Sequence, residues 1–146
     1  MPPWLNLMLE SLPSLAWACL QFTVPLTLLS FVFGLAVGFG VALVRLFAPW
    51  PFAALVRFYV WIIRGTPLLV QLFLIFYGLP SVGIVLDAFP AALIGFTLNV
   101  GAYTSEIIRA VLSAVPKGQW EAAYSTGMTW AQAMRRIAWP QVMPIE

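Results

Sequence analysis

An uncharged stretch of 34 residues lies between Glu10 and Arg45, and it limits the possible fold more than any other feature of the chain. A helix needs about 20 apolar residues to cross the hydrocarbon core of a bilayer. The stretch therefore predicts a membrane span, which we place at about residues 20–44. Residues 1–19 combine Trp4 and several prolines with scattered polar groups, so we predict that they lie at the level of the lipid headgroups.

The composition extends this conclusion to the whole chain. Hydrophobic residues make up 62% of it and charged residues only 8%, against roughly a quarter charged in ordinary soluble domains. In water, so much apolar surface would promote aggregation. The chain is therefore predicted to be an all-α, polytopic membrane protein.

The sequence lacks the residues and motifs that several kinds of activity require. It has no His and one Cys, so it offers no zinc cluster and no His-containing catalytic triad. Its single lysine, Lys117, does not belong to a phosphate-binding glycine loop. The net charge of +2 argues against binding of nucleic acid. We expect a protein that is not an enzyme, holds no metal or cofactor itself, and depends on another chain for any ATP hydrolysis.

Two further spans are predicted after the first. One lies at about residues 58–79, with a bend near residues 65–67, because a proline there disturbs a straight helix. The other lies at about residues 91–111. Gln71 is the only strongly polar side chain in the middle of the second span. It either lines a transport path or forms a hydrogen bond to another helix.

The third predicted span carries polar residues on one face. Asn99, Tyr103 and Glu106 are spaced four and three residues apart, which places them on the same side of a helix. A polar stripe inside a membrane indicates a functional site, here a substrate path. For Glu106 we favour a simple ion pair with Arg109 near the aqueous end. For Asn99 and Tyr103 both interpretations stay open.

Small residues in the first span predict close packing against another helix. Gly34 and Gly38 share one face, and the pair Ala36 and Gly40 is offset from them by two residues. Such spacing lets two helix backbones approach closely. We interpret it as packing within the membrane.

The positive charges predict the orientation in the membrane. All seven Arg and Lys residues follow the first span or surround the end of the third, whereas Glu10 and Asp87 fall on the other side. Because cytoplasmic segments are enriched in Lys and Arg, the N-terminus is predicted to lie outside and residues 112–146 in the cytoplasm.

The segment from Pro116 to Pro140 is a polar island in the chain. Two short helices are predicted here, separated by Gly127, which can adopt the left-handed conformation. The second is predicted to begin at Thr129, because Thr129 and Gln132 have the spacing of a capping box. Pro140 is predicted to end it.

A longer spacing pattern covers this segment. It consists of Glu121-Ala122-Ala123, three residues, Gly127, nine residues, Ile137, one residue and Trp139-Pro140. This pattern resembles the EAA loop of bacterial ATP-binding-cassette (ABC) importer permeases, which usually have Leu in place of Trp139. The blocks RGTPLLVQLFLIFYGLP at 64–80, AYTSEIIRA at 102–110 and KGQWEAA at 117–123 resemble the polar amino-acid permeases of histidine, glutamine, arginine and cystine type, most closely the L-cystine permeases.

The resemblance implies a type I ABC importer transmembrane fold over residues 20–146, with three membrane helices and a cytoplasmic EAA loop at 112–146. The implied partners are cytoplasmic ATPase subunits that bind ATP and Mg²⁺, a second permease copy or a sister permease, and an external amino-acid-binding protein. The implied location is the bacterial inner membrane. The implied function is import of L-cystine or a similar amino acid by alternating access.

The same resemblance makes the helix from about Gln119 to Thr126 the coupling helix, which docks on the ATPase. The residues expected to couple it are Glu121, Ala122, Ala123 and Gly127. The apolar anchors are expected to be Trp120, Tyr124 and Trp130. The alternative is an amphipathic helix that rests on the lipid headgroups.

The family has further membrane spans after the EAA loop, whereas this chain stops at Glu146. We therefore expect a truncated chain or, if it is complete, a defective or regulatory relative.

Two other functions stay open. The first is a small channel or ion-coupled carrier that uses the polar stripe of the third span. Uptake that survives without the ATPase but collapses with the ion gradient would indicate it. The second is a non-transporting scaffold that recruits the ATPase. Copurification with an ATPase, without substrate-stimulated hydrolysis, would indicate that one.

Overall fold

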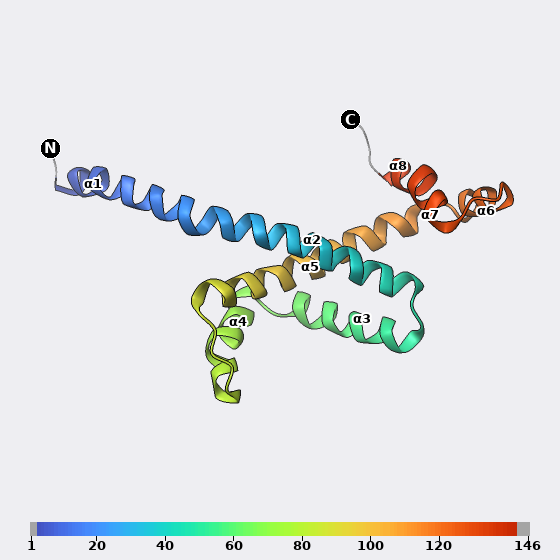
Figure 1. Ribbon diagram of the computed structural model, residues 1–146. Coiled ribbons are helices and arrows are strands. Elements are labelled where there is room, and N and C mark those ends of the chain that lie inside the picture. Colours follow the sequence, from blue (N-terminus) through green and yellow to red (C-terminus); the bar gives the residue numbers. More distant parts are fainter. Residues whose placement is uncertain (1–2, 143–146) are drawn as a thin grey trace.

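The computed structural model describes residues 3–142, and these residues form helices without any strand (Figure 1). The helices Glu10–Phe47 and Ala88–Ala114 are each long and apolar enough to cross a membrane. A bent pair of helices between them, Trp50–Gly65 and Leu68–Val82, has the combined length and composition of a third span. The outer ends of the predicted domains, residues 1–2 and 143–146, lie outside the described residues.

The first span is part of one long helical segment. Helix α1 (Pro3–Ala18) passes through a π-helical turn, η1 (Cys19–Thr23), into α2 (Val24–Phe47). The backbone N–H of Val24 donates to Cys19 O across this turn, so the hydrogen bonding continues. The predicted boundary at residue 19 is therefore not a break in the helix.

The second predicted span is not one straight helix. Helix α3 (Trp50–Gly65) meets the segment Leu68–Val82, which begins with helix α4 (Leu68–Phe73), at an angle of 108°. Their junction lies at Thr66–Pro67, where the sequence predicts the bend. After α4 the chain continues through a π turn, η2 (Leu74–Gly78), and a 3₁₀ turn, η3 (Leu79–Val82).

Gln71 holds this bend in place. The two N–H groups of its side-chain amide are shared among three acceptors, since Nε2 lies 2.6 Å from Ile63 O, 3.0 Å from Thr66 O and 2.9 Å from Thr66 Oγ1. These carbonyls lie at the end of α3, where no further helical turn is present to use them. The buried Gln71 therefore supplies the donors that the interrupted helix lacks.

Helix α5 (Ala88–Ala114) contains the predicted span 91–111 and extends beyond it at both ends. It crosses α2 at close range, and the two helices run in the same direction, while α3 runs the opposite way (Figure 1). A Cβ atom added to Gly34 would lie 2.5 Å from Val100 Cγ1, and one added to Gly38 would lie 2.8 Å from Thr104 Cβ. These distances are too short for a side chain, so glycine is required for this approach.

The second small pair of the first span does not share this role. A Cβ atom added to Gly40 would meet no atom of the described residues within 4 Å. The α2–α5 contact instead continues through Ser30 and Ala42, which are buried at the same four-residue spacing as Gly34 and Gly38. The packing prediction is thus confirmed for Gly34 and Gly38, and for Gly40 it stays a prediction, since nothing in the described residues packs against it.

The end of the described chain forms a compact set of short helices, which we call the α6–α8 element. It consists of α6 (Lys117–Ser125), α7 (Trp130–Ala133), a π turn, η4 (Met134–Ala138), and α8 (Trp139–Val142). Helix α6 begins two residues before the predicted Gln119 and ends one residue before Thr126. The split into two helices around Gly127 is confirmed.

Pro140 does not end the last helix, which is contrary to the prediction. It lies within α8, two residues after the end of the π turn η4, and the backbone N–H of Trp139 donates to Met134 O across this turn. A π turn widens the helix at the place where the proline ring would otherwise meet a carbonyl. The same arrangement occurs before Pro25 and Pro80, since η1 and η2 each end two residues ahead of a proline.

Candidate functional site

Helix α6 presents its two faces to different surroundings. Ala123 is 1% exposed and packs inward, whereas Glu121, Ala122 and Gly127 are exposed. Three of the four residues expected to couple to an ATPase therefore lie on the outer surface. Ala123 does not, because it already contacts the rest of this chain.

The turn after α6 is a Schellman motif. The backbone N–H of Met128 donates to Ala123 O at 3.1 Å, and that of Gly127 donates to Tyr124 O at 3.0 Å. Gly127 has a φ of +78°, the left-handed conformation that this motif needs and that glycine adopts without strain. The conformation predicted for Gly127 is confirmed.

The capping box at the start of α7 is also confirmed. The backbone N–H of Gln132 donates to Thr129 Oγ1 at 3.4 Å, and that of Thr129 donates to Gln132 Oε1 at 2.9 Å. Two N–H groups at the helix start are thereby satisfied. The angle between α6 and α7 thus depends on hydrogen bonds made within a few residues.

Aromatic side chains attach the α6–α8 element to the membrane helices. Trp120 packs against a cluster formed by Leu112, Val115 and Ala138. The ring of Trp130 meets that of Phe47, at the end of α2, edge-on with centroids 5.1 Å apart. Two of the three predicted anchors therefore contact this chain rather than pointing away from it.

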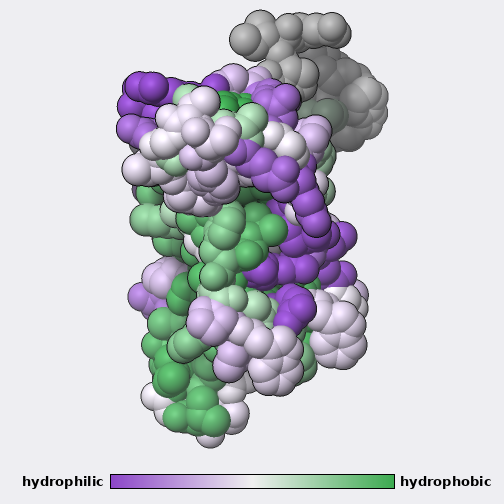
Figure 2. Space-filling model, turned by 90° about the vertical axis from the view of Figure 1, so that its right-hand side faces the viewer, coloured by the Kyte–Doolittle hydropathy of each residue, from purple (hydrophilic) through white to green (hydrophobic). Residues whose placement is uncertain are grey.

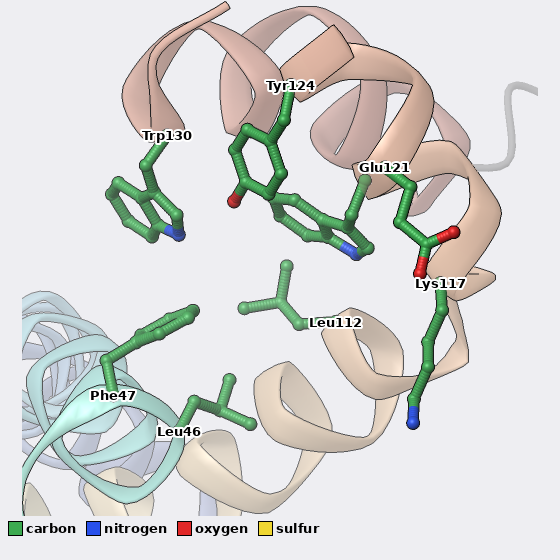
Figure 3. Close-up of a pocket in the computed structure, with 8 residues that line it drawn as sticks. Leu46, Phe47, Leu112, Lys117, Glu121, Tyr124 and Trp130 are labelled. Atoms are coloured by element: carbon green, nitrogen blue, oxygen red, sulfur yellow. The ribbon is translucent and has the colours of Figure 1, made fainter.

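A groove of about 370 Å³ lies between the element and the ends of α2 and α5. Figure 3 shows Leu46, Phe47 and Leu112 on one side of it, facing Tyr124 and Trp130 on the other. Most of its lining is apolar, and Glu121 and Lys117 stand at its edge. The groove thus lies where the α6–α8 element meets both membrane helices.

A second constellation lies on α5 and its neighbours. Arg109 donates two hydrogen bonds to Glu106 Oε2, at 3.1 Å from Nε and 3.0 Å from Nη2, so the predicted pairing is confirmed. Arg45 of α2 donates a hydrogen bond to Glu106 Oε1. Arg64 of α3 lies 3.7 Å from the same oxygen. One carboxylate therefore joins three helices.

The three residues predicted to line a substrate path have different surroundings. Asn99 Nδ2 donates to Gln71 Oε1 at 3.2 Å, so Gln71 forms the hydrogen bond between helices that was one of its two interpretations. Tyr103 is 47% exposed, and the Arg64 guanidinium lies over its ring, 5.3 Å from the centroid. Tyr103 is therefore the member of this set with the most accessible surface.

The sequence offered no local signal for several of these contacts. Arg45 is 61 residues from Glu106 along the chain. Tyr59 Oη donates to Leu98 O at 2.6 Å and joins α3 to α5. Such contacts depend on how the helices are placed relative to one another.

Polar residues are distributed unevenly over the surface. Figure 2 views the molecule from the end at which α2 finishes. In this view, hydrophilic residues cover much of the upper half and one side, and the lowest part is apolar. A pocket of about 420 Å³, which we call the arginine pocket, lies between α2, α3 and α5. Its lining residues are Arg45, Arg57, Val60, Trp61, Arg64, Gly65 and Glu106.

Comparisons with known proteins relate these features to one family. The family model described as binding-protein-dependent transport system inner membrane component matches residues 31–145. The chain is 48% identical over 143 residues to the L-cystine transport system permease protein TcyB of Bacillus subtilis, covering 98% of this chain and 61% of that protein. It is 44% identical to the probable amino-acid ABC transporter permease protein PatM of Vibrio harveyi, covering 93% of this chain and 62% of that protein.

A solved structure gives the same result. The chain is similar to a crystal structure described as an amino acid ABC transporter with histidines, with a TM-score of 0.81 and 41% sequence identity. The match covers 92% of this chain and 63% of the other. The chain thus spans about three fifths of the length of these relatives, and the resemblance to amino-acid permeases found in the sequence is confirmed.

Proposed function

The chain belongs to the family of binding-protein-dependent transport system inner membrane components, and from this premise we propose that it serves as the permease subunit of an ATP-driven importer of a polar amino acid. The observation that carries the proposal is the exposed outer face of α6, within an element that aromatic contacts attach to the ends of two membrane helices. Such an element suits the transfer of movement from a soluble partner into the membrane.

The proposed partners follow from the same role. Cytoplasmic ATPase subunits bind ATP and Mg²⁺ and contact the outer face of α6 through Glu121, Ala122 and the Gly127 turn. A second permease, either a copy or a sister chain, faces this one in the membrane, and an external protein delivers the amino acid. The proposed orientation has the N-terminus outside and the α6–α8 element in the cytoplasm, since the basic residues gather on that side.

The coupling step uses two contacts within this chain. When the ATPase moves α6, Trp130 transmits the movement to α2 through Phe47, and Trp120 transmits it to α5 through Leu112 and Val115. Ala123 contributes by packing α6 against the chain, because its methyl group is buried. Closely packed helices move as units, so a shift at α6 changes how α2 and α5 face the second permease.

The proposed substrate path follows the face of α5 that carries Tyr103. Asn99 and Gln71 act as positioning residues, because they bond to each other and hold the bend between α3 and α4 beside that face. Alternating access then requires that this face is exposed to the outside and to the cytoplasm in turn.

L-cystine is the proposed substrate. The support is the identity of 48% with the L-cystine permease TcyB over nearly the whole chain. The test is uptake of radiolabelled L-cystine into proteoliposomes that contain the complete permease with its ATPase and binding protein. We expect accumulation that requires ATP on the cytoplasmic side and is reduced by an excess of unlabelled L-cystine.

Three results would contradict the proposal. Uptake that continues without the ATPase and collapses with the ion gradient would identify an ion-coupled carrier. An ATPase that copurifies but is not stimulated by any amino acid would identify a scaffold. If another amino acid competes for uptake and L-cystine does not, the proposed role as an importer stands, but the proposed substrate is wrong.

A further inference from the structure

The arginine pocket has more positive charge than its own carboxylate can balance. Its lining carries three guanidinium groups, those of Arg45, Arg57 and Arg64, against the one carboxylate of Glu106. We propose that this pocket binds the carboxylate of the transported amino acid, with Arg57 and Arg64 as the residues that hold it. This inference rests on the proposed function, because it assigns a binding site to the same transport path.

The first step of the argument is that both carboxylate oxygens of Glu106 already accept hydrogen bonds from arginines. One of its oxygens accepts from Arg45, and the other accepts twice from Arg109. Over residues 3–142, the other acidic side chains are Glu10 in α1, Asp87 ahead of α5 and Glu121 on α6. None of these lines the pocket. The excess positive charge therefore needs an anion that this part of the chain does not provide.

The second step is that hydrogen-bond donors remain available. The Arg64 guanidinium is 3.7 Å from Glu106, which is longer than a hydrogen bond, and its side chain is 44% exposed. Arg57 uses Nε to donate to Ala53 O at 3.1 Å, and its terminal nitrogens make no hydrogen bond within the described part of the chain. Arg45 contributes a buried Nε that lacks a partner among the same residues. All three arginines line the arginine pocket.

The third step is the match of chemistry and size. A guanidinium group presents two parallel N–H donors that fit the two oxygens of a carboxylate. Charged residues that face the interior of a bundle of membrane helices mark substrate pathways by default. The volume of about 420 Å³ lies within the roughly 300–1,000 Å³ typical of small-molecule sites. Tyr103, on the proposed path, lies directly beneath Arg64.

A lipid phosphate carries the same kind of oxyanion and is the competing ligand. We favour the carboxylate because the pocket is built by three packed helices rather than by one basic helix at the surface. The experiment must therefore separate a substrate carboxylate from a headgroup phosphate.

The test measures equilibrium binding to the complete transporter in detergent, without the external binding protein. The probes are L-cystine and cystamine, which has the same disulfide and amino groups but no carboxylates. Wild-type protein should bind L-cystine and should bind cystamine much more weakly. Arg64→Gln and Arg57→Gln should each lower the affinity for L-cystine by about 10- to 100-fold, as expected for loss of a charge-assisted hydrogen bond. Neither variant should weaken the binding of cystamine.

Two controls keep the result specific. Arg136→Gln removes an exposed arginine of the α6–α8 element, outside the pocket, and should leave the affinity for L-cystine unchanged. Arg64→Lys keeps the charge but loses the paired donors, so a partial loss is expected. Monodispersity on gel filtration and an unchanged ATPase complement show that each variant is assembled.

Several outcomes would overturn the inference. Equal binding of L-cystine and cystamine by the wild type would show that the carboxylate is not recognised. Unchanged affinity in both glutamine variants would show that the pocket is not the site. An effect of the variants only in vesicles that contain phosphatidylglycerol would identify a headgroup site. Failure of the wild type to transport any amino acid would instead refute the proposed function.

Discussion

The contact between α2 and α5 and the turn between α6 and α7 both depend on glycine, but for different physical reasons. At Gly34 and Gly38 there is no space for a side chain, because Val100 and Thr104 of α5 lie within 3 Å of where a Cβ would stand. At Gly127 the described residues leave at least 4 Å free around the added Cβ, but φ is +78°. The first region requires glycine because a Cβ atom would clash with the neighbouring helix. The second requires it because the backbone is left-handed.

This difference follows from the surroundings of the two regions. Inside a membrane there is little hydrophobic driving force between helices, so they are held by close backbone approach and by polar contacts such as those of Glu106. The short helices of the α6–α8 element are held instead by caps, by the Schellman turn and by partly buried aromatic side chains such as Trp120. At the α2–α5 contact, the effect of a substitution on stability should therefore depend on the size of the new side chain. At the turn between α6 and α7, it should depend on the backbone conformation that the new residue prefers.

The largest effect is expected at the α2–α5 contact. Gly34→Leu should lower the free energy of unfolding by about 3 kcal/mol or more, since the packed helices must separate to admit the side chain. Gly40→Leu is the matched control, because the same side chain there points into open space. Unfolding by sodium dodecyl sulfate in mixed micelles, followed by circular dichroism, measures both. Equal losses at the two positions would show that the approach of α2 to α5 is not what requires glycine.

An intermediate effect is expected at the turn. Gly127→Ala should destabilise the turn by about 1–2 kcal/mol, the cost of a left-handed conformation for a residue with a Cβ. Gly118→Ala, inside α6 and equally free of neighbours, should be neutral or slightly stabilising, because alanine favours helix. Hydrogen exchange of residues 117–133 measures both variants. If Gly127→Ala leaves the exchange of Met128 unchanged, the left-handed turn is not what holds α6 and α7 together.

The smallest effect is expected at the start of α7. Thr129→Ala removes the side-chain acceptor of the capping box and should cost about 1 kcal/mol. Ser125→Ala removes a hydroxyl that only donates to a carbonyl of its own helix, so little change is expected. Faster exchange of the Gln132 amide in the first variant, and not in the second, is the expected result. The reverse order would mean that α7 is held by Trp130 and not by its cap.

The features that were predictable from the sequence are those that depend on neighbouring residues. The bend at Thr66–Pro67, the left-handed Gly127 and the box formed by Thr129 and Gln132 each depend on a few consecutive positions. The pair formed by Glu106 and Arg109 is separated by one helical turn and is local in the same sense. Pro140 was predicted wrongly because the rule that proline ends a helix takes no account of a preceding π turn.

The sequence by itself determined that this protein is an α-helical membrane protein, and its motifs pointed to the permease family. It could do so because hydrophobicity, caps and turns depend on short stretches of chain. Only the tertiary structure decided that Arg45 and Arg64 meet at Glu106, that Ala123 faces inward, and that Trp130 reaches Phe47. These contacts depend on the rotation and crossing of whole helices, which residues distant in the sequence determine together.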